Sequence, residues 1–506
     1  MSTEQLEIES KYDVDEHAIL PALHELPGVD SVAQPVEHDL EAVYFDTKGL
    51  DLAANKVTLR RRTGGEDDGW HVKLPVSSGE RLEIHHPLGR SVDKVPIQVV
   101  RAVRVHARDN ELTAVVTLKT HRIVHRLLDA DGEVLAEVSD DTVTASVGDG
   151  EPETWREWEV ELVHGTEELL EAAEPLLLKA GAGPASGPSK LARALGDRVP
   201  RRESWALPGK PTTSDLFRAY AGAQVEAIRE RDPEVRRNLP DSIHKMRVAT
   251  RRLRSALATY RPVVDREEGD RIRAELKWFA GELGGARDAE VMREHLRSAV
   301  AEQPAELVMG RVAGMIDDHL RGVYKAARVQ ALAALESARY FRLLDTLDEL
   351  IANPPLTGTD RKAAKQLPEL LDHDWRRTRK AVRRVERAVN GAGDRADDRA
   401  DDRAERDHDL HEVRKASKRL RYAGESAEPV LGSKATGLAA QAEQVQEVLG
   451  EHQDSVVARE LIRQLAVEVH LSGGNAFTYG RLHAAEEHRG ETSYQKFLDL
   501  WPVKRP

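Results

Sequence analysis

The sequence contains no cysteine, few aromatic residues and no long apolar run. Without cysteine, the fold has no disulfide, no thiolate metal site and no thiol nucleophile, and the composition fits a reducing compartment. The N-terminus, MSTEQLEIESKYDVDE, has neither a basic region nor an apolar region, so we expect no signal peptide. No segment of about 18 apolar residues is present, which argues against a membrane-spanning helix. We therefore expect a cytoplasmic protein without a membrane partner.

The chain has 506 residues, which predicts about two to four domains. Its charge is uneven. Residues 1–200 hold 21 basic and 38 acidic residues, a net of −17, whereas the remainder holds 54 basic and 50 acidic residues, a net of +4. This asymmetry indicates two parts with different ligands.

Residues 4–163 alternate apolar and polar side chains in about eight short runs, separated by turn signals such as Asp131-Gly132. This pattern predicts antiparallel strands that close into a barrel. Short helices are predicted at 15–25, 92–106 and 165–180.

From about residue 214 the apolar residues recur with the 3.6-residue period of an α-helix. Two similar segments lie in this region, HKMRVATRRLR from His244 and HEVRKASKRLR from His411, and a Leu-Gly…Asp element follows each about 40 residues later. The repeat predicts a duplicated helical bundle with two similar halves. An Ala-Asp-Asp-Arg tract at about 391–408 fits a charged helix extension or a solvated linker, and we expect a mobile insertion without chemistry. The predicted divisions are a first domain at 1–200, a linker at 201–213 and a helical domain at 214–500.

Charged residues of the first domain alternate with apolar ones. On a strand, Glu7, Glu9 and Lys11 share one face. The same rule groups Arg60 with Arg62, His71 with Lys73, Arg81 with Glu83, and Glu157 with Glu159 and Glu161. One such strand is typical of a solvated sheet face, but several together predict a barrel interior with charges of both signs. Such charges need compensation: the cations favour a polyanion, and the carboxylates favour Mg²⁺ or Mn²⁺. Together they indicate a site for a metal–polyphosphate chain.

Residues 5–195 resemble the CYTH domain, also called the triphosphate tunnel fold. Its hallmark Glu-x-Glu-x-Lys is present at Glu7, Glu9 and Lys11. The other matching pieces are Tyr44-Phe45-Asp46-Thr47, Leu59-Arg60-x-Arg62, Lys73, Arg81-x-Glu83, Lys119/Arg122, Glu137 with Asp141, Glu157-x-Glu159-x-Glu161 and Ser189-Lys190. Members of this family hydrolyse inorganic triphosphate or thiamine triphosphate, and a few cyclise ATP.

The resemblance implies roles for individual residues. The implied metal ligands are Glu7, Glu9, Asp141, Glu159 and Glu161. The implied phosphate-binding residues of the tunnel are Arg60, Arg62, Lys73, Arg81, Lys119, Arg122 and Lys190. The residues assigned to catalysis are Glu7, Glu9 and Lys11, with water attacking a terminal phosphorus directly. Because the alternation slips at 117–126, it stays open which of Lys119, His121 and Arg122 faces inward.

The helical repeat carries two basic stripes. At about 100° per residue, each copy aligns four basic groups on one helix face. These are His244, Arg247, Arg251 and Arg254 in the first copy, and His411, Arg414, Lys418 and Arg421 in the second. Repulsion along a stripe disfavours folding unless counter-charge is near, and phosphates supply it. Because Tyr422 is the one ring near these stripes, a base-free polyanion is favoured over nucleic acid.

Residues 213–490 look like the CHAD domain, the conserved histidine α-helical domain, through the two His-x-x-Arg helices and the two Leu-Gly…Asp elements. The resemblance implies binding of inorganic polyphosphate by these residues. The sequence as a whole therefore predicts an α+β N-terminal antiparallel barrel followed by an all-α duplicated bundle. Its predicted function is Mg²⁺- or Mn²⁺-dependent hydrolysis of inorganic triphosphate, joined to polyphosphate binding. The alternatives are a non-catalytic protein of polyphosphate granules, a hydrolase of an organic triphosphate such as thiamine triphosphate or a nucleotide, and an adenylate cyclase.

Overall fold

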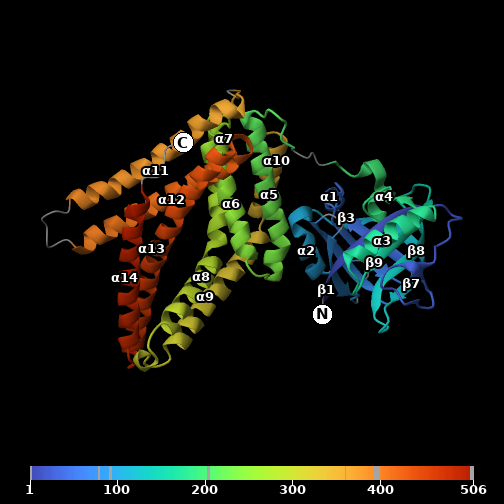
Figure 1. The fold of residues 1–506 in the computed structure, drawn as a ribbon, viewed down its shortest axis with the longest axis horizontal. Helices are drawn as coiled ribbons and strands as arrows, with labels where there is room; N and C mark the ends of the chain where they lie inside the picture. The colour runs from blue at the N-terminus through green and yellow to red at the C-terminus, as the bar shows by residue number, and fades with distance from the viewer. Residues whose placement is uncertain are drawn as a thin grey trace. The chain divides into compact units, whose positions relative to one another are not determined.

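The computed structural model describes residues 3–77, 80–89, 94–201, 206–358, 360–391 and 399–501. The chain divides into two compact units, Met1–Glu203 and Ser204–Pro506 (Figure 1). The linker predicted at 201–213 falls at this division, and its residues 202–205 lie outside the described residues. Across the described part of the chain, every helix is too short or too polar to span a lipid bilayer.

The first unit is an antiparallel β-barrel that closes on itself. Its strands are β1 (Thr3–Val14), β3 (Val36–Asp46), β4 (Thr58–Thr63), β5 (Gly69–Ser77), β6 (Glu80–Pro87), β7 (Thr113–Leu128), β8 (Val134–Ser146) and β9 (Glu153–Leu162). β1 pairs with β6 on one side and with β9 on the other, which closes the order β1-β6-β5-β4-β3-β7-β8-β9. Two short strands, β2 (Ser31–Val32) and β10 (Gly183–Pro184), pair with β7 and β1. The predicted barrel is confirmed.

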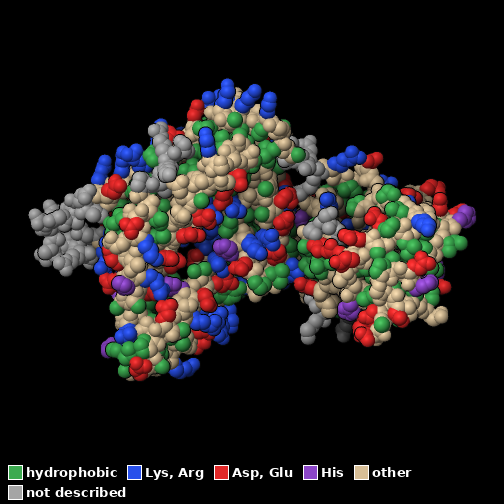
Figure 2. Space-filling view, in the orientation of Figure 1, with side chains coloured by type: hydrophobic (Ala, Val, Ile, Leu, Met, Phe, Trp, Pro, Cys, Tyr) green, Lys and Arg blue, Asp and Glu red, His purple; other side chains and the backbone are tan. Residues whose placement is uncertain are grey.

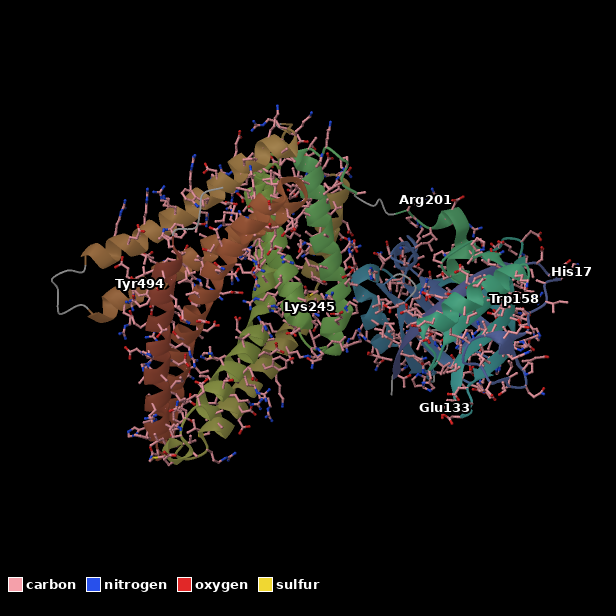
Figure 3. All side chains as sticks on the ribbon, viewed as in Figure 1. His17, Glu133, Trp158, Arg201, Lys245 and Tyr494 are labelled. Atoms are coloured by element: carbon pink, nitrogen blue, oxygen red, sulfur yellow. The ribbon has the colours of Figure 1, made fainter. Side chains whose placement is uncertain are left out.

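Two helices cover the outside of the barrel. α3 (Glu167–Lys179) packs on a cluster of buried side chains around Trp158 of β9, which Figure 3 labels on the barrel wall. α2 (Ile97–Ala107) packs on a second cluster around Trp70 of β5. Because successive side chains of a strand point to opposite faces, apolar residues buried under these helices leave their charged neighbours facing the interior.

The helices predicted in this unit are confirmed in part. The segments at 92–106 and 165–180 correspond to α2 and α3, although 92–93 lie outside the described residues. The helix predicted at 15–25 is wrong, because this segment holds only a 3-10 turn at Leu23–Glu25. Two further helices, α1 (Asp51–Ala54) and α4 (Lys190–Leu195), are too short for a periodic signal.

α4 closes one end of the barrel interior. Ser189 caps the helix by accepting a hydrogen bond from the Ala192 backbone N–H at 3.1 Å. Leu191 and Leu195 then pack against the apolar residues that face the interior at that end. These residues are Ala42, Tyr44, Val116, Leu118, Val143, Ala145 and Trp155. Charged side chains are therefore confined to the remaining length of the barrel.

The second unit is all-helical, as predicted. Its helices are α5 (Thr213–Arg237), α6 (Ser242–Thr259), α7 (Arg266–Glu282), α8 (Gly284–Ala301), α9 (Val312–Leu335), α10 (Ala338–Ala352), α11 (Ala363–Gly391), α12 (Arg399–Leu431), α13 (Ser433–Leu471) and α14 (Phe477–Leu500). Polar caps fix where some of them begin. Thr212 and Asp215 form a capping box at α5, and Asp265 accepts from the Glu268 N–H at α7.

The internal repeat forms equivalent helix pairs. α6 packs against α8, α12 packs against α13, and α6 and α12 also pack against each other. In each half a glycine lies beside the arginine of the His-x-x-Arg motif. A Cβ atom at Gly284 would lie 3.5 Å from Nη2 of Arg247, and one at Gly450 would lie 3.5 Å from Nη2 of Arg414. The predicted duplication is thus visible in matching contacts.

The tract predicted as a mobile insertion at 391–408 is described only in part. Residues 392–398 lie outside the described residues, whereas 399–408 form the first turns of α12. Those turns are the charged helix extension that the composition allowed, because Ala, Arg and Glu favour a helix. Arg403 and Arg406 also form ion pairs with Glu487 and Glu491 of α14.

Candidate functional site

The barrel encloses a cavity of about 340 Å³ with mostly charged walls. The predicted site residues that line it are Glu7, Glu9, Lys11, Arg60, Arg62, Lys73, Arg81, Arg122, Glu159, Glu161 and Lys190. The structure therefore brings together residues from both ends of this unit's sequence. Carboxylates from β1 and β9 form one wall, and the cations come mainly from β4, β5, β6, β7 and α4.

The innermost charges form one network around Arg122 and Lys190. Arg122 donates to both carboxylate oxygens of the fully buried Asp141, at 2.7 and 2.6 Å, and to Glu159 at 2.6 Å. The Lys190 Nζ lies 2.9 Å from Asp141, 2.7 Å from Glu157 and 2.6 Å from Glu159. Because a buried charge without a partner costs several kcal/mol, these pairs allow the charges to stay inside the barrel.

This network keeps its carboxylates ionised. Burial alone would raise the pKa of Glu159, yet Lys11 and Lys190 outweigh burial and leave that pKa well below its usual value. In the same way, Arg122 and Lys190 outweigh burial at Asp141 and lower its pKa. The expectation that the interior needs a ligand for charge balance is therefore wrong for this deep part, which balances itself.

Two other carboxylates are short of positive charge. Burial raises the pKa of Glu7 to about 7, although the Lys73 Nζ lies 2.5 Å away. Burial also raises the pKa of Glu161, whose side chain makes no ion pair or hydrogen bond with another described residue. In the strand register Glu161 stands opposite Glu9 on β1 and opposite Glu137 on β8. Like charges placed directly opposite each other repel, so this row favours a bound cation.

Two groups of carboxylates fit a divalent metal ion to different degrees. Asp141, Glu157 and Glu159 present oxygens within 4.8 Å of one another, which could hold a metal ion. However, the Lys190 ammonium group already lies at hydrogen-bond distance from all three, and a metal ion would have to displace it. Glu161 has no such competitor among the described residues. Although its neighbours Glu9 and Glu137 are paired with Lys11 and Arg126, each at 2.8 Å, the free oxygens of Glu161 make this row the better fit for a hard divalent cation.

The three residues left open on β7 are now placed. Arg122 lines the cavity, whereas Lys119 and His121 are exposed on the outer face. The His121 Nδ1 lies 2.9 Å from Asp39 on the neighbouring strand. The placement of Lys119 in the tunnel is therefore wrong, because β7 keeps regular alternation from Val116 to Arg122 and its odd-numbered residues face outward.

Sequence reasoning missed several residues of the cavity wall. Glu66, Asp67 and Arg126 were not named at all, whereas Tyr44, Glu83 and Glu137 were named in the sequence patterns but given no role in the site. Arg126 and Glu137 do carry a signal, since they continue the inward alternation of Arg122 and Asp141. Glu66 and Asp67 lie in the turn between β4 and β5, where alternation gives no information.

The helical unit gathers most of its predicted basic residues between α6 and α12. Arg414 and Lys418 of α12 lie close enough to Arg247 and Arg251 of α6 for mutual repulsion to lower the pKa of both α12 residues, after burial as the main cause. For Lys418 the pKa falls to about 7. Within the described residues, no carboxylate forms an ion pair with Arg251, Arg414 or Lys418. We call Arg247, Arg251, Arg254, Arg414 and Lys418 the central basic cluster.

The structure does not bring every predicted residue into this cluster. Arg421 instead forms ion pairs with two carboxylates, with Nε at 2.7 Å from Glu425 and Nη1 at 2.8 Å from Glu443. His244 and His411 are half-buried beside it. Burial and neighbouring cations lower the pKa of both rings, so they stay neutral at pH 7.

A second basic surface follows α11 and was not predicted. Its exposed cations are Arg376, Arg377, Arg379, Lys380, Arg383, Arg384 and Arg387. Figure 2 shows Lys and Arg side chains along this outer edge of the helical unit. The buried face of the helix, with Trp375, Val382 and Val385, packs into the bundle.

Comparisons with known proteins match both units. A family model of the CYTH domain matches residues 5–194, and a model of the CHAD domain matches residues 219–463. The uncharacterized protein Rv2226 of Mycobacterium tuberculosis is 39% identical over 497 residues, which cover 95% of this chain and 93% of that protein. The chain is a CYTH–CHAD protein. Its CYTH unit thus belongs to the triphosphate tunnel family, whose members are triphosphatases or cyclases.

Two solved structures resemble this CYTH–CHAD protein over part of its length. PptA from Streptomyces chartreusis is 22% identical with a TM-score of 0.46, covering 57% of this chain and 99% of that chain. The CHAD domain from the plant Ricinus communis is 27% identical with a TM-score of 0.46, covering 61% of this chain and 98% of that chain.

Proposed function

We propose that the CYTH tunnel hydrolyses inorganic triphosphate, or a short polyphosphate, with Mg²⁺ or Mn²⁺. One observation carries this proposal: the cavity presents cations on one wall and, on the other, a row of carboxylates that includes the uncompensated Glu161. A chain of phosphates accompanied by a divalent cation matches both walls. A neutral ligand would compensate neither the cations of one wall nor the carboxylates of the other.

The cations supply the phosphate sites. Arg60, Arg62, Lys73, Arg81, Arg122 and Lys190 all line the cavity. Arginine binds phosphate oxygens in a bidentate manner, and lysine acts as a mobile point charge. Several of these groups contact carboxylates in the free protein, such as Lys73 with Glu7 at 2.5 Å and Arg60 with Glu83 at 3.7 Å. These carboxylates hold the Arg and Lys side chains in position before substrate binds. Phosphate oxygens of the substrate would then replace the carboxylates as partners of the cations.

The metal ligands in this proposal are Glu7, Glu9 and Glu161, and Glu159 would join them where a metal ion displaces Lys190 from it. A bound Mg²⁺ or Mn²⁺ would neutralise charge that develops on the reacting phosphoryl group. The protein itself holds the phosphates in line and excludes alternative orientations, which provides most of the acceleration in phosphoryl transfer. A water oxygen bonds to the terminal phosphorus, the bridging P–O bond breaks, and pyrophosphate leaves. Lys11, between Glu9 at 2.8 Å and Glu159, helps to orient that water.

Phosphate release from triphosphate tests this proposal. We expect metal-dependent release by the full chain and at least a hundredfold loss in Glu9→Gln and Glu161→Gln, because each removes an anionic oxygen donor. Lys119→Ala is the matched control on the outer face and should retain full activity. If the wild-type protein releases no phosphate with either metal, the proposal fails. Parallel assays with ATP and thiamine triphosphate would identify an organic-triphosphate hydrolase or a cyclase instead.

We also propose that the central basic cluster of the CHAD unit binds inorganic polyphosphate. Support comes from its charge: five half-buried cations converge between α6 and α12, and among the described residues only Arg247 of the five forms an ion pair with a carboxylate, Asp288 at 2.6 Å. A flexible polyanion relieves this repulsion, and the shortage of aromatic side chains gives bases no stacking platform.

A gel-shift titration with long-chain polyphosphate tests the second proposal. We expect a salt-sensitive shift, since bound cations displace counter-ions from the polymer. The double charge reversal Arg251→Glu/Lys418→Glu should abolish the shift. Arg421→Glu, at a position already paired with carboxylates, should weaken it far less. If wild-type protein gives no shift at low salt, the proposal is rejected.

A further inference from the structure

The exposed rim of the tunnel is acidic. The side chains of Glu66 and Asp67 line the cavity and are 72% and 45% exposed, whereas those of Glu7 and Glu159 deeper inside are 5% and 9% exposed. This gradient of exposure places Glu66 and Asp67 at the opening. An anion that enters the cavity therefore passes these two carboxylates first.

The turn that carries them is fixed to the barrel. Gly64 has a φ of +95°, and a Cβ atom there would lie 2.0 Å from the carbonyl oxygen of Asp39 on β3. The Gly65 N–H donates to Asp68 at 3.1 Å, which closes the turn. His71 of β5 lies 3.0 Å from the carbonyl oxygen of Asp67. The two carboxylates are thus held at the opening and do not swing freely in solvent.

Both carboxylates contact cations of the opening. Asp67 forms an ion pair with Arg62, and Glu66 lies 3.5 Å from Arg126, which also binds Glu137 at 2.8 Å. Arg62 needs such a counter-ion. Burial and repulsion from Arg60 lower its pKa to about 9. Asp67 therefore takes the place that a phosphate oxygen would take.

We propose that Glu66 and Asp67 limit the tunnel to short phosphate chains. This inference rests on the proposed triphosphatase function and adds a length filter to it. The deep cations Lys73, Arg122 and Lys190 receive the leading phosphates, and Arg62 accepts one more when Asp67 releases it. Any phosphate beyond that point lies beside Glu66 and Glu137, whose neighbouring cation Arg126 is already paired with both, and it is repelled. The closed end at α4 prevents the chain from moving further in.

A comparison of inorganic tetraphosphate with inorganic triphosphate tests the length filter, because the two anions differ by one phosphate group. We would measure kcat/KM of the full chain for inorganic triphosphate and inorganic tetraphosphate with Mg²⁺. In Glu66→Gln/Asp67→Asn, the tetraphosphate-to-triphosphate ratio should rise about tenfold relative to wild type, because two negative charges at the opening are gone. Glu37→Gln/Asp39→Asn is the matched control, since it removes two exposed carboxylates from the outer face of β3. Its ratio should equal that of wild type. An unchanged ratio in the rim variant would overturn the inference.

Failure of the triphosphatase proposal can be distinguished from failure of the length filter. If wild-type protein hydrolyses neither anion, the triphosphatase function is rejected, and the length filter is then read from binding. Calorimetric titrations with the two anions are then made in the Arg251→Glu/Lys418→Glu background, where anion binding by the central basic cluster is removed and the remaining binding reports the tunnel. A rise in the affinity ratio for tetraphosphate in the rim variant supports the filter, and no rise refutes it.

Discussion

Lys190 in the tunnel and Lys418 in the helical unit are both enclosed by other charges, and they differ in the sign of those neighbours. Burial disfavours the charged form of each. At Lys190, Asp141 and Glu159 outweigh burial and raise the pKa, whereas at Lys418 the neighbouring Arg414 adds to burial and the pKa falls to about 7. The deep part of the tunnel, around Lys190 and Arg122, is therefore balanced by its own carboxylates, whereas Glu161 nearer the opening is not. The central basic cluster keeps positive charge in excess, and this repulsion lowers the pKa of Lys418 after burial as the main cause.

Removing a paired tunnel cation should have the largest effect on stability. Arg122→Ala leaves Asp141 without its main partner and removes one of the three cations paired with Glu159, which should lower the free energy of unfolding of the CYTH unit by about 3–5 kcal/mol. Hydrogen exchange of barrel peptides measures this without assuming that both units unfold together. Lys119→Ala on the same strand should change it by less than about 0.5 kcal/mol. Equal effects of the two substitutions would contradict the paired-charge description.

Removing the Lys418 charge from the helical unit should raise the free energy of unfolding, whereas removing Arg122 from the tunnel should lower it. At pH 6 both the folded and the unfolded state carry a proton on Lys418, so the folded state bears the full repulsion. Between about pH 7 and 10.5 the folded state has lost that proton while the unfolded state keeps it, and the penalty shrinks as pH rises. Lys418→Met should therefore stabilise the unit by about 1–2 kcal/mol at pH 6 and by less at pH 9.

Urea unfolding at the two pH values measures this effect. Lys245→Met is the control, because Lys245 is an exposed lysine of α6 and its removal should be neutral at both (Figure 3). A destabilised Lys418→Met protein at pH 6 would show that Lys418 has a stabilising partner.

The smallest expected effect is a difference in polyphosphate affinity between equivalent substitutions in the two halves of the repeat. Arg254 and Arg421 are equivalent in sequence, but Arg421 binds Glu425 and Glu443, whereas burial and Arg273 lower the pKa of Arg254. Arg254→Ala should weaken polyphosphate binding about fivefold, and Arg421→Ala by less than about twofold. Fluorescence titration at fixed salt resolves this difference. A similar loss in both variants would mean that the polymer uses the halves equally.

Much of the barrel could be predicted because alternation fixes which face a strand residue occupies. This rule placed Glu7, Glu9 and Lys11 together, and it extends to Arg122 once the register of β7 is known. It could not reveal that Lys190 would enter the interior, since that depends on a helix of six residues folding over the barrel end. The resemblance to the family supplied that residue.

Other parts depend on partners that are distant in sequence. Arg421 follows the same helical pattern as Arg254, and only the packing of α13 brings Glu443 to it. Glu66 and Asp67 lie in a turn, where neither period applies. Their role at the opening follows from a glycine conformation and from contacts with Arg62 and Arg126. Local pattern therefore predicts the wall of the site but not its rim.

The apolar plug formed around α4 makes the cavity a dead end at one side. Under the proposed triphosphatase function, a product held at Lys190 and Arg122 would have no rear exit and would leave only after the product nearer the rim. The innermost product would then compete directly with the next incoming chain.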